Sequence, residues 1–130
     1  NLMHVRIDRI SSVNVTKEKA RHFSEVSYYT NKFDAADYAN KSFNMFSGEP
    51  KPVQLICNND LLDVMLDRFG KSVKIQKNDE ASFILKTNAA VSNGLVAWIL
   101  QFGSRVKVKA PNDLIYEIKK AAEETYKLYD

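Results

Sequence analysis

The sequence is poor in metal ligands and thiols. It has one cysteine, Cys57, and two histidines, His4 and His22, among its 130 residues. A disulfide framework needs paired cysteines, and a zinc site needs three or four converging ligands, so we predict neither a disulfide nor a metal site. A single cysteine at an apolar strand position is typical of a protein of the reducing cytoplasm, which is the location we predict.

Long apolar runs and catalytic motifs are also missing. No uninterrupted apolar stretch approaches the ~20 residues that span a bilayer, and no secretory signal peptide is visible, so we expect no membrane partner. With only four glycines, the sequence has no phosphate-binding loop, and neither a Ser-His-Asp order nor a paired-carboxylate motif is present. We therefore predict no catalytic residues, no cofactor and no enzymatic activity. A net charge of +3 is modest for a dedicated nucleic-acid-binding domain.

What the sequence does have is an internal repeat. Phe69-Gly70 returns as Phe102-Gly103 at an offset of 33 residues, and the same offset maps Leu62 on Leu95 and Val73 on Val106. Each half has the pattern of a strand, a helix, a Phe-Gly stop and a second strand. Two such halves make one βαββαβ unit of ferredoxin-like type, whereas a solenoid needs at least three stacked repeats.

The residues within each half support this fold. Val53, Leu55 and Cys57 alternate with other residues as in a half-buried strand, and residues 83–87 repeat the pattern. Residues 73–77 and 105–109 are rich in Lys and Arg, which is typical of edge strands.

Residue types also mark where the helices begin, end and face the core. We expect Asn59 or Asp60 to cap the first helix, Ser92 or Asn93 the second, and Gly70 and Gly103 to end them. We expect the following side chains to face inward: Leu61, Leu62, Met65, Leu66 and Phe69 from the first helix, and Leu95, Trp98, Ile99 and Phe102 from the second.

Additional elements flank this unit. Met3, Val5 and Ile7 alternate with polar residues, which predicts a strand with a bulge or turn near Arg9. A helix capped by Asp34, with Phe33 and Tyr38 as a hydrophobic staple, should end near Gly48. A final amphipathic helix should run from Pro111 to about residue 128. The predicted class is therefore α+β, with boundaries at residues 1–31, 32–50 and 51–130.

Motifs along most of the chain resemble the C-terminal region of WYL-domain bacterial transcriptional regulators. Residues 5–10, Val-Arg-Ile-Asp-Arg-Ile, resemble the end of the WYL domain, where an R-x-x-R-I pattern closes a small Sm-like β-barrel. The remaining motifs resemble the C-terminal extension called WCX: Met45-Phe46-x-Gly48, Val53-Gln54-Leu55, Asp67-Arg68-Phe69, Leu95-x-x-Trp98-Ile99-Leu100-x-Phe102-Gly103, Val106-x-Val108-x-x-Pro111-x-x-Leu114 and Tyr126.

This resemblance implies an organisation and a ligand site. In such regulators a helix-turn-helix domain and the motif that names the WYL domain would lie upstream of Asn1, so we expect DNA to be bound only through that missing part. The family relation also implies a homo-oligomer and makes Arg6 and Arg9 candidates for binding an anionic effector, such as a nucleotide or a single-stranded nucleic acid. A guanidinium fork suits phosphate geometry. The two arginines converge only if the strand bends between them, and Ile10, which breaks the alternation, indicates such a bend.

Other interpretations stay open. The arginines could be solvated strand charges that pair with Asp8. Ile56 and Ile84 would form an apolar patch on the outer sheet face, rimmed by Lys74 and Lys107. This patch could be an assembly surface or a ligand floor, or the N-terminal segment or the last helix could cover it. The chain could also be a stand-alone small-molecule-binding domain. An acylphosphatase-like hydrolase is disfavoured, because the loop after the first strand has no glycine to cradle an anion.

Overall fold

A computed structural model describes residues 2–41, 48–71 and 73–129. Its centre is one antiparallel sheet in the order β2-β3-β1-β4. The strands are β1 (Pro50–Asn58), β2 (Lys74–Lys77), β3 (Ser82–Ala90) and β4 (Val106–Ala110). The protein is therefore a mixed α+β protein, and the prediction that the two Lys-rich strands form the sheet edges is confirmed.

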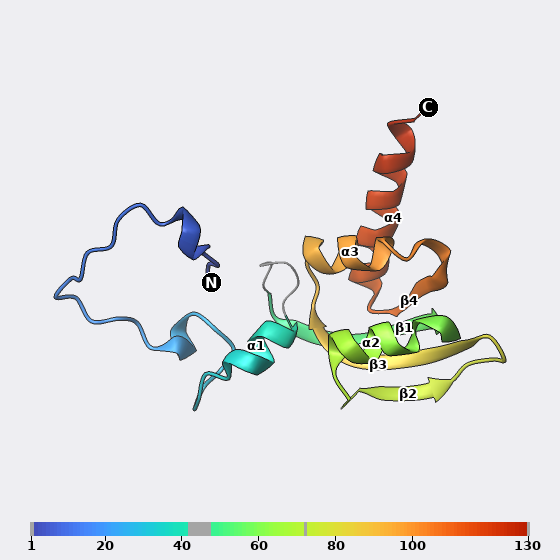
Figure 1. Cartoon of the computed structure of the whole chain (residues 1–130), viewed down its shortest axis with the longest axis horizontal. Coiled ribbons are helices and arrows are strands. Elements are labelled where there is room, and N and C mark those ends of the chain that lie inside the picture. The colour runs from blue at the N-terminus through green and yellow to red at the C-terminus, as the bar shows by residue number, and fades with distance from the viewer. Residues whose placement is uncertain (1, 42–47, 72, 130) are drawn as a thin grey trace.

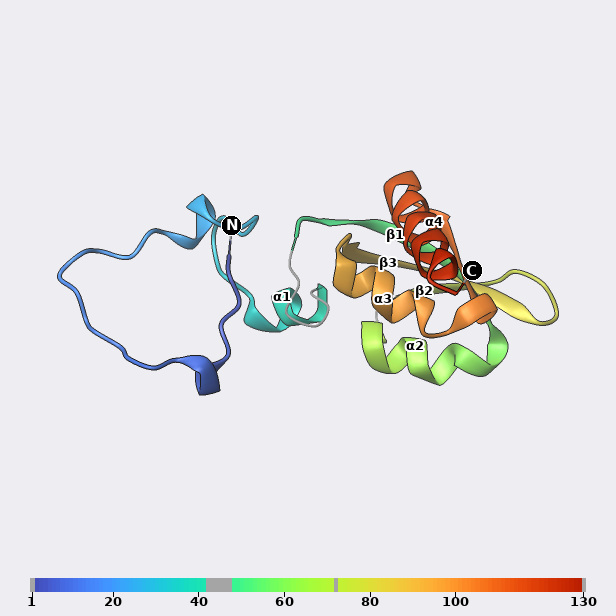
Figure 2. The same ribbon diagram turned by 90° about the horizontal axis from the view of Figure 1, so that it is seen from above.

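Helices α2 (Leu62–Phe69) and α3 (Asn93–Leu100) lie on the same side of the sheet (Figures 1 and 2). They bury their apolar side chains against the strand residues that point toward them. The alternation predicted for β1 is confirmed, because Val53, Leu55 and Cys57 are fully buried. The core also contains Leu61, Met65, Phe69, Phe83, Leu85, Ala89, Leu95, Val96, Ile99, Val106, Val108 and Leu114.

The strands differ in how much of their neighbour they cover. β1 pairs with β3 over its whole length, from Pro50 opposite Ala90 to Asn58 opposite Ser82. The short β2 pairs only from Lys74 opposite Lys86 to Lys77 opposite Phe83. Residues 87–90 of β3 therefore extend beyond β2, and helix α1 (Ala35–Lys41) contacts β3 as well as α2.

Several helix ends follow the sequence signals. Ser92 accepts a hydrogen bond from the Leu95 amide (3.2 Å) and caps α3 as predicted. Gly70 is the C-cap of α2 and has a φ of 85°, a region that side chains disfavour. The second helix ends before the predicted Gly103, because α3 stops at Leu100 with Gln101 as its C-cap, and Gly103 (φ 57°) begins the 3₁₀ turn Gly103–Arg105. Asp34 caps α1 by accepting from the Asp37 amide (3.0 Å).

The predicted cap of α2 is wrong. A 3₁₀ turn, Asn59–Leu61, precedes the helix, and Leu61 occupies the N-cap position without a side-chain cap. The two polar side chains are used elsewhere: Asn59 donates to the Glu80 carbonyl (3.0 Å), and Asp60 accepts from Arg105 (3.1 Å). These contacts connect the start of α2 to the β2–β3 turn and to β4.

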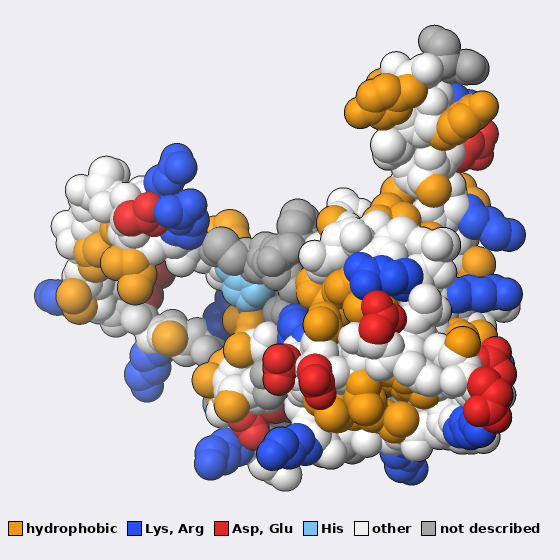
Figure 3. Space-filling view, turned by 45° about the vertical axis from the view of Figure 1, so that its right-hand side comes forward, with side chains coloured by type: hydrophobic (Ala, Val, Ile, Leu, Met, Phe, Trp, Pro, Cys, Tyr) orange, Lys and Arg blue, Asp and Glu red, His pale blue; other side chains and the backbone are white. Residues whose placement is uncertain are grey.

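The apolar stripes are narrower than predicted. Leu62 on α2 is 38% exposed, whereas Leu61, Met65 and Phe69 are buried. The final helix α4 (Asn112–Lys127) buries Leu114, but its last turns project beyond the sheet domain (Figures 1 and 3). Figure 3 shows hydrophobic side chains on that projecting end, where Tyr126, Leu128 and Tyr129 are exposed.

The predicted N-terminal strand is also wrong. The described residues 2–34 contain only two 3₁₀ turns, Ile7–Arg9 and Phe23–Glu25, and Met3, Val5 and Ile7 are exposed. A strand is stable only when a neighbour satisfies its backbone groups, and this arm extends away from the sheet (Figure 1). Alternation alone therefore did not produce a strand.

Around α1 the predicted staple is present, since the rings of Phe33 and Tyr38 lie 5.5 Å apart. Ser42, Phe43 and Phe46, which the sequence places on the same helix, fall outside the described residues. Among the described helices, none is long and apolar enough to cross a membrane.

Candidate functional site

The two candidate arginines lie on one tight turn of the exposed N-terminal arm. The Arg9 amide donates to the Arg6 carbonyl (3.0 Å), which closes the 3₁₀ turn Ile7–Arg9. A bend therefore lies between the arginines, at the place where the alternation of the sequence breaks. The arm is extended on both sides of the turn, with Arg6 and Ile10 in the β region.

Arg6 already has an anionic partner. Its Nε and Nη2 atoms donate to the two carboxylate oxygens of Asp8 at 2.9 and 2.6 Å. Both side chains are 58% exposed, so water screens this two-point contact and its net stabilisation is small. Its two-point geometry is the one in which a guanidinium binds an oxyanion.

A cluster of aromatic side chains joins the arm to α1. Tyr29 donates to Asp37 (2.5 Å), and Lys41 donates to the same carboxylate (2.9 Å). Burial, followed by the hydrogen bonds with Asp37 and Tyr28, raises the pKa of Tyr29. Partial burial acts to raise the pKa of Asp37, but the bonds from Tyr29 and Lys41 outweigh it and lower that pKa. The ring contacts of the cluster are His4–Tyr38, Phe23–Phe33, Tyr29–Phe33 and Phe33–Tyr38.

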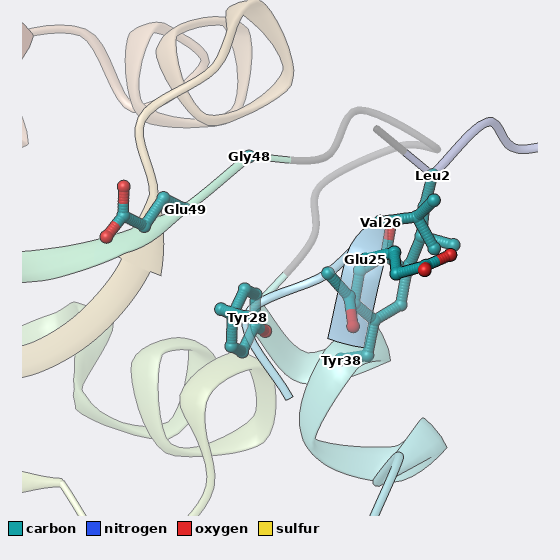
Figure 4. A pocket seen from close by; sticks show the side chains of 8 residues that line it. Leu2, Glu25, Val26, Tyr28, Tyr38, Gly48 and Glu49 are labelled. Carbon is teal, nitrogen blue, oxygen red and sulfur yellow. The ribbon is translucent and has the colours of Figure 1, made fainter. Parts of the chain in front are cut away.

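A cavity of about 460 Å³ lies between the arm, α1 and the segment before β1 (Figure 4). Two carboxylates, Glu25 and Glu49, line it, and neither Arg6 nor Arg9 does. The Tyr38 hydroxyl is buried without a hydrogen-bond partner in the described part of the chain. The remaining lining residues are Leu2, Val26, Ser27, Tyr28 and Gly48. Its charge does not suit an anionic ligand.

A second cavity, of about 440 Å³, lies where β2 begins and where α1 approaches β3. We call it the β2 groove. Its lining combines cations, amides and apolar side chains: Asp37, Lys41, Pro52, Val53, Gln54, Phe69, Val73, Lys74, Lys86, Thr87 and Asn88. Strand alternation predicts that Gln54 and Lys86 lie on the outer face. No sequence signal predicts that α1 lies near them.

The outer sheet face carries the predicted apolar pair. Ile56 and Ile84 are direct cross-strand partners, and Ile84 is only 7% exposed. Lys74 and Lys107 lie at the two edges of the same face and are exposed. The patch is therefore small, with cations on both sides.

Cys57 is buried in the core. Burial raises the pKa of the Cys57 thiol to about 12, so the reactive thiolate is scarce at neutral pH. Among the described residues no group of three His, Cys, Asp or Glu side chains is placed to hold a metal ion.

Comparison with known families adds a decisive observation. The family model of the WCX domain matches residues 53–126. The chain belongs to the WCX-domain family. The match begins in β1 and ends in α4, so it covers most of β1, all of β2, β3 and β4, and helices α2 and α3. A comparison with curated proteins finds no match.

The WCX domain is associated with WYL-type transcriptional regulators, so the match supports a regulatory context for this chain. The resemblance recognised from Val53-Gln54-Leu55 and from the motif around Trp98 is thereby confirmed for the C-terminal region. Residues 1–52 lie outside the match, and the roles of Arg6 and Arg9 stay predictions.

Proposed function

We propose that this WCX chain is the effector-sensing and assembly part of a bacterial transcriptional regulator of the cytoplasm. In this proposal DNA is bound by a helix-turn-helix upstream of Asn1, and the regulator assembles as a homo-oligomer. The observation that carries the proposal is the WCX match over residues 53–126. The modest net charge of +3 fits a part that does not itself hold duplex DNA.

The proposal includes a domain organisation. Residues 51–130 form a ferredoxin-like sandwich with an added helix, which the β-α-β-β-α-β order and the antiparallel pairing support. Residues 32–50 form a linker around α1. Residues 1–31 form the tail of a WYL-type domain that completes its Sm-like barrel with upstream strands, and this would satisfy the backbone of the arm.

The reading frame that encodes the chain provides the first test. We expect a helix-turn-helix within the preceding ~200 residues, a distance set by the usual size of one or two domains. The intact protein should bind duplex DNA from its own promoter, whereas this 130-residue chain should not. A reading frame without a DNA-binding domain would leave a stand-alone small-molecule-binding domain as the better interpretation. Sequence-selective binding of duplex DNA by the 130-residue chain alone would contradict the assignment of DNA binding to an upstream domain.

Within this proposal Arg6 and Arg9 contribute to an anionic effector site that the upstream part completes. Calorimetry of the intact regulator with nucleotides and short single strands tests this role. Arg6→Ala and Arg9→Ala should each weaken binding about tenfold, since charge-assisted hydrogen bonds contribute roughly 1.5–3 kcal/mol. Arg21→Ala, an exposed arginine of the same arm, is the matched control. If all three variants bind the effector with the affinity of the wild type, Arg6 and Arg9 are ordinary surface charges.

A further inference from the structure

The β2 groove exists because β2 is shorter than β3. β2 covers β3 only as far as Lys86, and Thr87 and Asn88 of β3 continue past the start of β2. Helix α1, which contacts β3, contributes Asp37 and Lys41 to the lining of the groove. Together with residues 52–54 of β1, four separate segments of the chain line the groove.

The groove concentrates positive charge at its sheet side. Lys74 on β2 and Lys86 on β3 are direct cross-strand partners, and like charges in this position destabilise a sheet. Gln54 on β1 is the partner of Lys86 on its other side. These three side chains form one row on the outer face, with strands spaced about 4.8 Å apart.

These lysines have no counter-charge in the structure. Among the described residues no carboxylate lies within ion-pairing distance of Lys74 or Lys86. The nearest acidic lining residue, Asp37, is paired with Lys41 at 2.9 Å. An incoming anion would therefore meet two unneutralised ammonium groups.

Protection of the sheet edge does not explain both lysines. Edge strands use lysine to prevent pairing with other sheets, and this accounts for Lys74 on β2. β3 lies inside the sheet, between β2 and β1, so Lys86 has no edge to protect. Edge protection therefore does not account for Lys86.

The groove also has an apolar side. Phe69 at the end of α2 and Val73 just before β2 line it together with Val53. Gln54, Thr87 and Asn88 also line the groove and bring amide and hydroxyl groups to it. Ligand sites commonly combine apolar walls with a few converging polar groups, and 440 Å³ lies within their usual range.

We propose that the β2 groove binds a small organic anion. Lys74 and Lys86 hold a phosphate or carboxylate group, and a ring-sized apolar body packs against Phe69 and Val73. This site lies entirely within the described sheet domain and α1, so it does not depend on the proposed effector role of Arg6 and Arg9.

The test uses the 130-residue chain and four small probes. Phenyl phosphate and benzoate carry the anion and the ring, inorganic phosphate lacks the ring, and benzyl alcohol lacks the charge. Two-dimensional NMR titration should show saturable shifts at Lys74, Lys86 and Thr87 with phenyl phosphate or benzoate. Inorganic phosphate and benzyl alcohol should bind more weakly, and the preferred ring-bearing anion identifies the acidic group.

Charge-neutral variants locate the site. Lys74→Gln and Lys86→Gln should each weaken binding of the ring-bearing anion by about three- to tenfold, as expected for exposed ion pairs with hydrogen bonds. Lys107→Gln is the matched control, because it removes a cation from the same sheet face without lining the groove. Circular dichroism and thermal melting verify that each variant is folded.

Three results would overturn the proposal. The first is equal binding of benzyl alcohol and the two ring-bearing anions, and the second is no saturable shift with any probe. The third is an equal effect of Lys107→Gln and Lys86→Gln, which would indicate diffuse attraction to the basic face. Because the regulator assignment rests on the WCX match, none of these results changes it.

Discussion

Phe69 and Trp98 pack edge to face, with ring centroids 5.4 Å apart and ring planes at 83°. Phe69 closes the helix of the first sequence repeat, and Trp98 lies in the helix of the second. Trp98 makes a similar contact with Phe102, at 4.9 Å and 75°. The two Phe-Gly stops that reveal the repeat therefore place both phenylalanines against one tryptophan, and this aromatic contact joins the halves of the domain.

Trp98→Ala should destabilise the protein by about 2–4 kcal/mol, below the loss at a fully buried site, because Trp98 is only partly buried against the core. Chemical denaturation monitored by circular dichroism measures the free energy of unfolding. Tyr116→Ala on the exposed side of α4 is the control and should change it by less than about 0.5 kcal/mol. A loss below about 1 kcal/mol for Trp98→Ala would place Trp98 outside the packing that joins the repeats.

Cys57 should resist alkylation in the native protein. Burial raises the pKa of its thiol to about 12, and its side chain is fully inside the core, so reagents reach it only when the sheet opens. Iodoacetamide labelling at pH 8 should be fast in denaturant. Without denaturant, its rate should follow the unfolding equilibrium. Rapid native labelling that is insensitive to stabilising salts would contradict a buried β1.

Lowering the pH should weaken the contacts that Asp37 of α1 makes with Tyr29 and Lys41. The hydrogen bonds from Tyr29 and Lys41 outweigh burial and lower the pKa of Asp37 below its ordinary value of 3.8. A carboxylate whose pKa is depressed by folding stabilises the folded state above its unfolded pKa, and this contribution is lost as pH falls through the folded pKa. We therefore expect α1 to keep its contacts at pH 5 and to lose this contribution below about pH 4.

The carboxyl carbon resonance of Asp37 reports this titration directly. Its midpoint should lie below 3.8 in the wild-type chain and should move upward in Lys41→Gln and in Tyr29→Phe, since each variant removes one bond to the carboxylate. A midpoint at or above 3.8 in the wild type would show that the Tyr29–Asp37–Lys41 contacts are not formed in solution.

The sheet domain could be predicted because its signals are local and agree with one another. Alternation indicated the faces of β1 and β3, Ser92 marked where α3 begins, and Gly70 marked where α2 ends. The cap of α2 failed for a non-local reason, because Asn59 and Asp60 bond to Glu80 and Arg105, which are distant in sequence. A spacing rule cannot detect that competition.

The β2 groove was not predictable for a similar reason. Its cations meet only because the turn between β2 and β3 sets the register. There Asp79 accepts hydrogen bonds from the Ala81 amide and the Ser82 hydroxyl, both at 2.8 Å. That register brings Lys74 opposite Lys86. A slip of one residue would move every side chain of β2 to the other face and remove the cation pair.

The last prediction concerns the Asp8 carboxylate, which is paired with the Arg6 guanidinium. Asp8 accepts two hydrogen bonds from the Arg6 guanidinium, so in the proposed regulator an anionic effector must displace it before it can use both donors. Asp8→Asn removes the competing charge but keeps the side-chain shape. Since exposed pairs contribute about 0–1 kcal/mol, this variant should bind the effector up to about fivefold more tightly, whereas Arg6→Ala should bind it more weakly.

Calorimetry of the intact regulator compares the two variants, with Asp34→Asn as a charge-matched control in the same segment of the chain. Opposite signs for Asp8→Asn and Arg6→Ala are expected only if the effector uses this guanidinium. Weaker binding in both variants would instead mean that the Arg6–Asp8 pair orders the turn, and that the pair as a whole supports the site.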